Sequence, residues 1–199
     1  RKTPSEGVLA DLHAKAIAFQ DSSGQQAVML TVDVIGFNDK VSKHICDGVS
    51  KKTGLAREQI LLCPSHTHTG PVIGLPGATG YDLEGAEAEV VHKFCKELAG
   101  TLADLADSAL EDVQPAKLSH GVGVATFAMN RREPTRRGIR LGFNPSGYVD
   151  RSVPVLKVES PEGKLRAVLF GCACHNTTLT GKHFQLSGDY AGYAQAEIE

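Results

Sequence analysis

The sequence has no apolar run that approaches the roughly 20 residues needed to span a membrane. It also shows no signal peptide, no internal repeat, no low-complexity tract and no interdomain linker. Its charge is nearly balanced, with 21 basic and 23 acidic residues, so it lacks the electrostatic footprint of a nucleic-acid-binding protein. We therefore expect no transmembrane segment and no nucleic-acid partner, while the compartment and the oligomeric state stay open.

A disulfide framework is also missing, because five cysteines cannot all pair within the chain. Cys46 and Cys95 fall on apolar faces of predicted helices, and Cys63 and Cys172 lie in strand-like runs, where free cysteine behaves as a small buried hydrophobe. The segment CACH at 172–175 has one residue between its cysteines, whereas a haem attachment motif has two. No second ligand pair stands at zinc-finger spacing, so we expect an unstapled core.

What is present is a pattern of strands and helices typical of an α/β protein. Alternating or continuous apolar runs predict strands, and apolar residues repeated every three or four positions predict helices. In chain order we expect a hairpin of 13–19 and 27–34, a helix over 38–52, a buried strand over 60–64, an irregular loop over 70–85, a helix over 87–110, a strand near 118–124, a polar loop over 132–151, a hairpin of 153–158 and 165–174, and a last helix from near Tyr190. This order predicts a mixed central sheet flanked by helices.

The segment Ser65–Pro71, with the sequence SHTHTGP, follows the predicted buried strand directly. Imidazole is a common zinc ligand and also a proton shuttle near neutral pH. We expect the chain to turn near Gly70 and Pro71, so that His66 and His68 face different ways, one toward a metal ion and the other toward a substrate. The alternative is a pair of surface or hydrogen-bonded histidines.

A second histidine, His175, ends another apolar run, 165–174, and polar residues follow it. In open α/β proteins, functional groups collect just beyond the carboxyl ends of strands. We therefore expect His66 and His175 to converge on one metal ion. Catalytic zinc usually has three protein ligands and a water, so these two residues alone do not complete a zinc site.

Four motifs, in this order, resemble those of the neutral/alkaline non-lysosomal ceramidases and their bacterial relatives. Ser65–Pro71 is similar to the SHTHSGP signature of the family, and Asn130-Arg131 is similar to its NR motif. The segment 173–178 (ACHNTT) resembles the second histidine motif, and 187–193 (SGDYAGY) resembles the S-x-D-x-x-G-Y segment. The resemblance covers nearly the whole chain and is closer to uncharacterised bacterial relatives than to the ceramidases proper.

The resemblance implies a zinc-dependent hydrolase that cleaves an amide bond, with a small-molecule or lipid-like substrate such as a ceramide-like N-acyl compound. It implies zinc as the cofactor, His66 and His175 as metal ligands, and His68 and Arg131 as catalytic residues. In such a site His68 would shuttle a proton, and Arg131, which stays charged, would contact a carbonyl or oxyanion. Asn130 and Asp189 are candidates for substrate contact, and Asp189 has a role as helix N-cap as its alternative.

The family completes its zinc site with a glutamate and a tyrosine, and supplies a serine nucleophile, all downstream of the second histidine motif. We therefore expect residues 1–199 to be an interior part of a larger catalytic domain, truncated at both ends. Two other functions remain open. One is a catalytically inert relative that binds a lipid-like or sugar ligand, and the other is a metal-dependent esterase.

Five arginines form the densest basic patch of the sequence, beside the NR motif. They are Arg131, Arg132, Arg136, Arg137 and Arg140. The plain interpretation of the patch is a solvated basic loop. Within it we expect Arg131 to point into a cleft and Arg132 to face solvent, because neighbours on an extended chain face opposite ways. The remaining histidines have no chemical partners in the sequence and are interpreted as structural or surface residues: His13, His44, His92, His120 and His183.

Overall fold

The computed structural model describes residues 4–79, 81 and 83–199. The chain divides into two compact units, which we call unit 1 (residues 1–113 and 176–199) and unit 2 (residues 114–175). No helix in the described ranges is long and apolar enough to cross a membrane.

Unit 1 contains all the helices of the described chain and most of its short strands. Its elements are β1 (Gly7–Val8), β2 (Ala14–Gln20), β3 (Gln26–Val32), α1 (Asp39–Thr53), the 3-10 turn η1 (Arg57–Gln59), β4 (Ile60–Pro64), β5 (Gly74–Leu75), β6 (Ala78–Thr79), α2 (Gly85–Glu111), β12 (Gln185–Leu186) and α3 (Asp189–Ile198).

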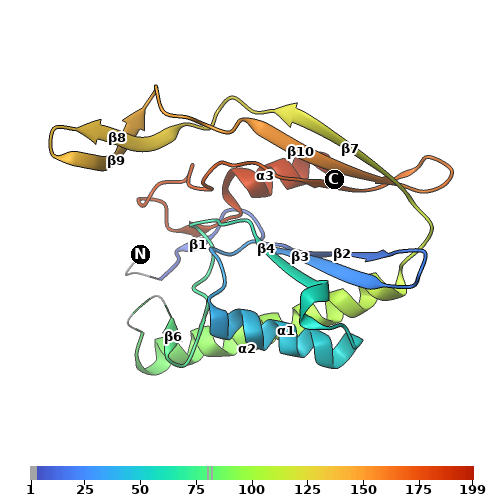
Figure 1. Ribbon diagram of the computed structural model, residues 1–199. Helices are drawn as coiled ribbons and strands as arrows, with labels where there is room; N and C mark the ends of the chain where they lie inside the picture. The colour runs from blue at the N-terminus through green and yellow to red at the C-terminus, as the bar shows by residue number, and fades with distance from the viewer. Residues whose placement is uncertain (1–3, 80, 82) are drawn as a thin grey trace. The chain divides into compact units, whose positions relative to one another are not determined.

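The central sheet of unit 1 has the order β2-β3-β4 and is mixed. Strands β2 and β3 form the predicted antiparallel hairpin, and β4 pairs with β3 in parallel after the chain has passed through α1. Helices α1 and α2 lie on one side of this sheet and α3 on the other (Figure 1). The prediction of an α/β fold with a mixed sheet flanked by helices is therefore confirmed.

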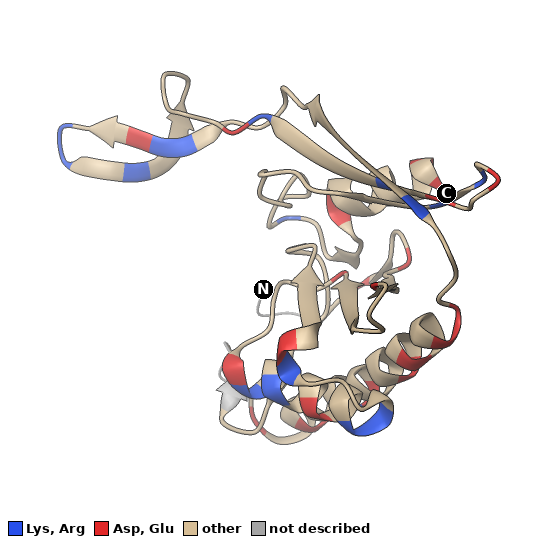
Figure 2. Cartoon of the chain, turned by 45° about the vertical axis from the view of Figure 1, so that its right-hand side comes forward, with Lys and Arg blue, Asp and Glu red and all other residues tan. Residues whose placement is uncertain are grey.

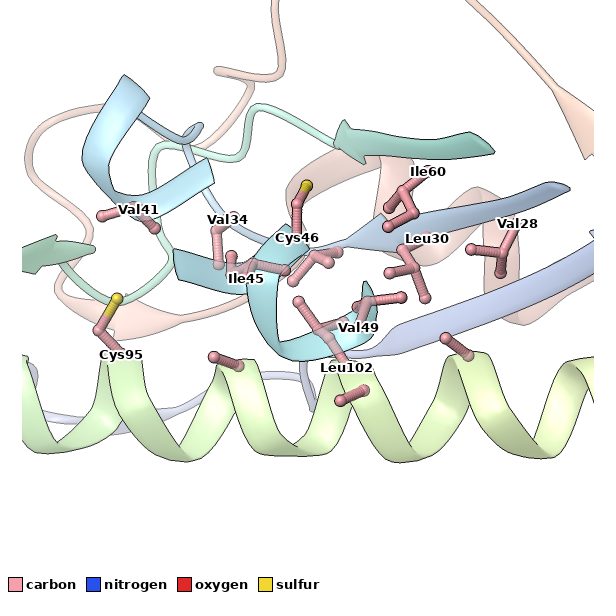
Figure 3. Close-up of a cluster of buried hydrophobic side chains, with 14 of the residues drawn as sticks. Val28, Leu30, Val34, Val41, Ile45, Cys46, Val49, Ile60, Cys95 and Leu102 are labelled. Atoms are coloured by element: carbon pink, nitrogen blue, oxygen red, sulfur yellow. The ribbon is translucent and has the colours of Figure 1, made fainter. Parts of the chain in front are cut away.

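The core of unit 1 lies between the sheet and the two helices α1 and α2. Val28, Leu30 and Val32 alternate along β3 and are buried, as the two-residue period of a strand requires. The helices add apolar stripes of helical period. These stripes consist of Val41, Ile45 and Val49 of α1, and Cys95, Ala99, Leu102 and Ala106 of α2 (Figure 3).

Helix α1 shows why its boundaries could be predicted closely. The side chain of Asn38 caps its first turn by accepting the backbone N–H of Val41 at 3.0 Å. Gly54 ends it in the left-handed conformation (φ 77°), and its N–H donates to the carbonyl of Ser50.

All five cysteines are free, so the expectation of an unstapled core is confirmed. Cys46 and Cys95 are buried, and Cys63 is half-buried. Burial raises the pKa of each of these three thiols, which disfavours the reactive thiolate.

Unit 2 consists of a three-stranded antiparallel sheet and a separate hairpin. The sheet has the order β11-β10-β7, built from β7 (Lys117–Val124), β10 (Ser152–Glu159) and β11 (Leu165–Phe170). The hairpin pairs β8 (Asn130–Thr135) with β9 (Gly138–Asn144).

The prediction of a polar loop over 132–151 is wrong for most of its length, because β8 and β9 occupy this region. The signal was present as Ile139, Leu141 and Phe143, which alternate along β9 with the period of a strand. This strand pattern was overlooked because several arginines and Pro134 surround it in the sequence.

Two further boundaries differ from the predictions. The expected strand 165–174 ends as β11 at Phe170, so His175 follows four residues of irregular chain instead of the strand itself. The irregular loop 70–85 contains the two-residue strands β5 and β6, which pair with each other.

Candidate metal centre and its buried support

The loop that carries His66 and His68 continues directly from β4. Backbone N–H groups of Ser65 and His66 donate to the carbonyls of Val32 and Val34, at 2.9 and 3.1 Å, and so prolong the parallel pairing with β3. His66 has a φ of 60°, an uncommon conformation for a residue with a side chain. The chain therefore changes direction at His66, and a turn at residues 68 and 69 and a bend at residue 70 follow, so the expected turn near Gly70 is present as well.

The expectation that the two histidines face different ways is wrong, because the structure brings their rings together. The Nε2 atoms of His66 and His68 lie 3.4 Å apart, and the rings meet edge to face with centroids 4.9 Å apart. Between the two exposed histidines, Thr67 is fully buried, so its side chain points into the interior.

The ring of His66 is oriented for metal binding. Its Nδ1 lies 2.5 Å from the carbonyl oxygen of Ile35, which can only accept a hydrogen bond. The proton of the neutral ring is therefore placed on Nδ1, and Nε2 carries the lone pair. A second nitrogen held by a carbonyl in this way is the usual support of a metal-ligating histidine.

His66, His68 and His175 each offer one nitrogen, and these three atoms lie within 4.8 Å of one another. This group could hold a metal ion. Two nitrogen ligands at the usual zinc distance of about 2.0–2.1 Å stand roughly 3.3 Å apart in tetrahedral geometry. The observed 3.4 Å between His66 and His68 therefore suits a shared ion, so the geometry admits His68 as a third ligand as well as a proton shuttle.

His175 is the last residue of unit 2, and it is bonded to Asn176, which is buried in unit 1. The Asn176 side chain donates to the carbonyls of Ser65 (3.2 Å) and Gly188 (3.0 Å). The backbone carbonyl of Asn176 accepts the backbone N–H of His68 at 3.4 Å. Asn176 thus ties the point where His175 joins unit 1 to the loop that carries the other two histidines.

Thr67 and Thr69 anchor the same loop from inside. Both are buried, their hydroxyl oxygens lie 3.0 Å apart, and each lies within 2.8 Å of the carbonyl oxygen of Ser187. The HTHT sequence thus alternates exposed histidines with buried threonines. This alternation is the signal in the sequence that could have identified the threonines as part of the site.

Gly70 follows with little room for a side chain. A Cβ there would lie 3.1 Å from both the carbonyl oxygen of Asp33 and the side chain of Thr67. The glycine therefore lets the loop pack closely against Asp33 and Val34, which directly follow β3.

Asp189 is fully buried, and its carboxylate organises the chain after His175. It accepts the backbone N–H groups of Thr178 (3.1 Å), Leu179 (2.8 Å) and Tyr190 (2.6 Å). The N-cap position of α3 belongs to Gly188, so the alternative of Asp189 as the N-cap is wrong in position. The structure places Asp189 beneath the loop, where it supports the segment next to His175.

Unit 2 contains a shallow hollow that brings several predicted residues together. Asn130, Arg131 and His175 line it, together with Met129, Arg132, Tyr148, Val149, Asp150 and Ala173. Arg131 is half-buried and Arg132 is exposed. Both line the hollow, so the assignment of the inward role to Arg131 alone stays a prediction.

Both polar atoms of the Asn130 side chain form hydrogen bonds with residues that line this hollow. Its amide nitrogen donates to the carbonyl of Tyr148 at 2.9 Å, and its amide oxygen accepts the N–H of Arg132 at 2.9 Å. Asp150, which no sequence motif indicated, adds a carboxylate to the same lining. Hydrogen bonds from the backbone and the hydroxyl of Ser152 lower the pKa of Asp150, so it is charged near neutral pH.

Comparison with known proteins agrees with the motifs. Residues 2–199 match the family model described as neutral/alkaline non-lysosomal ceramidase, N-terminal. Neutral ceramidase B of Dictyostelium discoideum is 26% identical over 192 residues, which cover 91% of this chain and 26% of that protein. Neutral ceramidase of Mycobacterium tuberculosis is 25% identical over 205 residues, which cover 94% of this chain and 30% of that protein.

Solved structures show the same fold. Neutral ceramidase from Pseudomonas aeruginosa matches 97% of this chain with a TM-score of 0.72 and 20% identity. A ceramidase complexed with C2 matches with the same TM-score and identity. In both cases the chain spans 31% of the matched structure, so it corresponds to about a third of their length.

Proposed function

Because the chain belongs to the neutral/alkaline non-lysosomal ceramidase family, we propose that it forms part of an enzyme that hydrolyses the amide bond of a ceramide-like N-acyl lipid. Since it spans 26–31% of the relatives and structures that it matches, we propose that residues 1–199 are part of a larger catalytic domain. The remaining parts of that domain would supply the rest of the metal site and the nucleophile.

The observation that carries this proposal is the meeting of three imidazole nitrogens from two motifs more than 100 residues apart in the sequence. The residues fit zinc by their donor chemistry, since neutral imidazole is a preferred zinc ligand and His66 has its lone pair on Nε2. We assign His66 and His175 as ligands. A zinc ion held there would supply a Lewis acid next to the scissile bond.

The chain's own residues would handle the proton and the carbonyl. His68 would take the proton of the attacking hydroxyl and return it to the leaving amine, which requires an imidazole within hydrogen-bond reach of both groups. Arg131 would donate to the carbonyl oxygen of the substrate as negative charge develops on it. Asn130 would hold the chain on which Arg131 stands, through its bonds to Tyr148 and Arg132.

The proposal is tested by metal analysis and by turnover of an N-acyl sphingosine, both on the full-length protein. His66→Ala and His175→Ala should each lower the zinc content and abolish hydrolysis. His120→Ala serves as the matched control, because His120 is an exposed histidine on β7. It should leave both quantities unchanged.

Unchanged zinc in both His66→Ala and His175→Ala would contradict the metal assignment. Full zinc with no turnover of amide or ester substrates in the wild type would identify a catalytically inert relative instead. Cleavage of an ester with no cleavage of the matching amide would identify an esterase.

A further inference from the structure

The β8–β9 hairpin of unit 2 has two chemically different faces. Its ladder pairs Pro134 with Ile139 and Arg132 with Leu141. Residues that lie opposite each other in an antiparallel pair share a face, and so do residues two positions apart on one strand. Ile139 and Leu141 therefore lie on one face, and Phe143 continues their row along β9.

The opposite face is polar, and its charged side chains, Arg140 and Glu133, pair with each other. Arg140 donates from Nε and Nη2 to the two carboxylate oxygens of Glu133, both at 2.9 Å. The Glu133 side chain also covers Gly142, where a Cβ would lie 2.0 Å from its carboxylate oxygen. This face needs no further partner.

The first face leaves large apolar side chains in contact with solvent. The exposed fractions are 72% for Ile139, 70% for Leu141 and 58% for Phe143. Single exposed apolar residues are ordinary, but a continuous row of them on one face marks an interaction surface. We call this row, Ile139, Leu141 and Phe143, the apolar strip.

The same hairpin is strongly basic. It carries five arginines against one glutamate, and two of them, Arg136 and Arg137, occupy its turn. Figure 2 shows the basic residues at the turn and along the strands. Within the described residues, one arginine of this hairpin is found in an ion pair: Arg140, which pairs with Glu133.

The apolar strip and the arginines together indicate which kind of partner the hairpin binds. A nucleic acid would meet the arginines, but it would leave the aliphatic Ile139 and Leu141 in water, since bases stack on aromatic rings. An anionic lipid surface meets both: its headgroups attract the arginines, and its acyl region accepts the apolar strip.

We propose that the β8–β9 hairpin docks onto a lipid surface that carries negatively charged headgroups, with the apolar strip entering the acyl boundary and Arg136 and Arg137 contacting the headgroups. This proposal deepens the proposed function, because an enzyme for an N-acyl lipid must reach a substrate held in a membrane. The docking itself requires no metal and no turnover.

The test measures binding of the full-length protein to vesicles that contain no ceramide. Vesicles of phosphatidylcholine alone are compared with vesicles that include phosphatidylglycerol, by flotation at two salt concentrations. The wild type should bind the anionic vesicles, and added salt should weaken the binding. Arg136→Glu with Arg137→Glu should reduce the partition coefficient about tenfold or more, since each basic side chain adds to the attraction.

Ile139→Thr with Leu141→Thr should also reduce binding, because threonine keeps the preference for strands while it removes apolar surface. Two double variants serve as controls and should bind as the wild type does. Lys96→Glu with Lys164→Glu reverses the same charge elsewhere, and Val122→Thr with Val124→Thr removes exposed apolar surface from β7.

The proposal would be overturned if the wild-type protein does not bind anionic vesicles, or if the hairpin variants bind them as strongly as the wild type does. If the double variant Ile139→Thr with Leu141→Thr binds vesicles as the wild type does but has a lower melting temperature, the rest of the protein covers the apolar strip. Turnover of a water-soluble short-chain N-acyl substrate is measured on the same samples, so a failure of docking is distinguished from a failure of the proposed function.

Discussion

Unit 1 and unit 2 differ in where their apolar side chains lie. All 16 residues of the main core cluster belong to unit 1. Of the 18 buried apolar residues of the described chain, only Ala128 and Val158 lie in unit 2, whereas 10 of its 17 exposed large apolar side chains lie there. Unit 1 therefore has an apolar core of its own behind the loop that carries His66 and His68. In unit 2 most of the large apolar side chains are exposed.

The same substitution in the two units should expose this difference most strongly. Leu102→Ala in α2 removes a fully buried side chain, and we expect it to lower the free energy of unfolding by about 2–5 kcal/mol. Leu141→Ala in β9 removes a side chain that is mostly in solvent, and the change should stay within about 0.5 kcal/mol. Urea denaturation of the two variants measures both. Equal losses would mean that Leu141 is covered and that the contrast between the units is false.

His68 of unit 1 has two candidate roles, as a proton shuttle and as a metal ligand. If His68 shuttles a proton, His68→Ala should retain zinc and lose about a hundredfold in turnover. Zinc content and kcat are measured on the same preparation of full-length protein. Loss of zinc together with activity would make His68 a third ligand, a role that its 3.4 Å approach to His66 also suits.

Asp189 tests whether the buried polar residues of unit 1 hold the site in place. Asp189→Asn keeps the shape but leaves one oxygen to accept hydrogen bonds from three backbone N–H groups. We expect a loss of about 1.5–3 kcal/mol in the free energy of unfolding, as for hydrogen bonds to a charged group. Asp11→Asn, at an exposed position, is the control and should be neutral. A neutral result at both positions would remove Asp189 from the support of the site.

Arg131 and Arg132 test the hollow of unit 2. Arg131→Lys should lower kcat/KM about tenfold, because lysine cannot reproduce the two-pronged donor geometry of a guanidinium. Zinc content should not change. Arg132→Lys, on the exposed neighbour, should be nearly silent in the same assay. The reverse order of effects would assign the inward role to Arg132.

The smallest expected effect is a pH dependence in the β8–β9 hairpin. Hydrogen bonds from Arg140 lower the pKa of Glu133 below its ordinary value. The ion pair therefore contributes fully above the unfolded pKa of Glu133, and its contribution is lost as the pH falls through the lower, folded pKa. A carboxyl NMR titration should show the lowered pKa, and Arg140→Gln should raise it. An identical titration in both proteins would show that the pair does not form.

Sequence patterns were sufficient where the structure depends on neighbours in the chain. The repeat of Val41, Ile45 and Val49, with Asn38 and Gly54 at its ends, identified α1 almost to the residue. The same local patterns identified the β2–β3 hairpin and the strand that leads to His66.

Patterns failed where distant partners or unusual backbone decide the outcome. The turn at His66 depends on a positive φ that no neighbouring residue announces. The burial of Asp189 depends on backbone groups near residue 178, and the anchoring of Thr67 depends on the carbonyl of Ser187, 120 positions away. The apolar strip of β9 was overlooked because it alternates among arginines and faces solvent.

The proposed metal centre requires that the histidines of the two motifs share one metal ion. This is measured in a crystal structure of the full-length protein, with anomalous diffraction recorded on both sides of the zinc absorption edge. We expect one zinc peak within about 2.0–2.1 Å of a ring nitrogen of His66 and of His175. A zinc peak bound elsewhere, or zinc-replete crystals with no peak between these two residues, would contradict it.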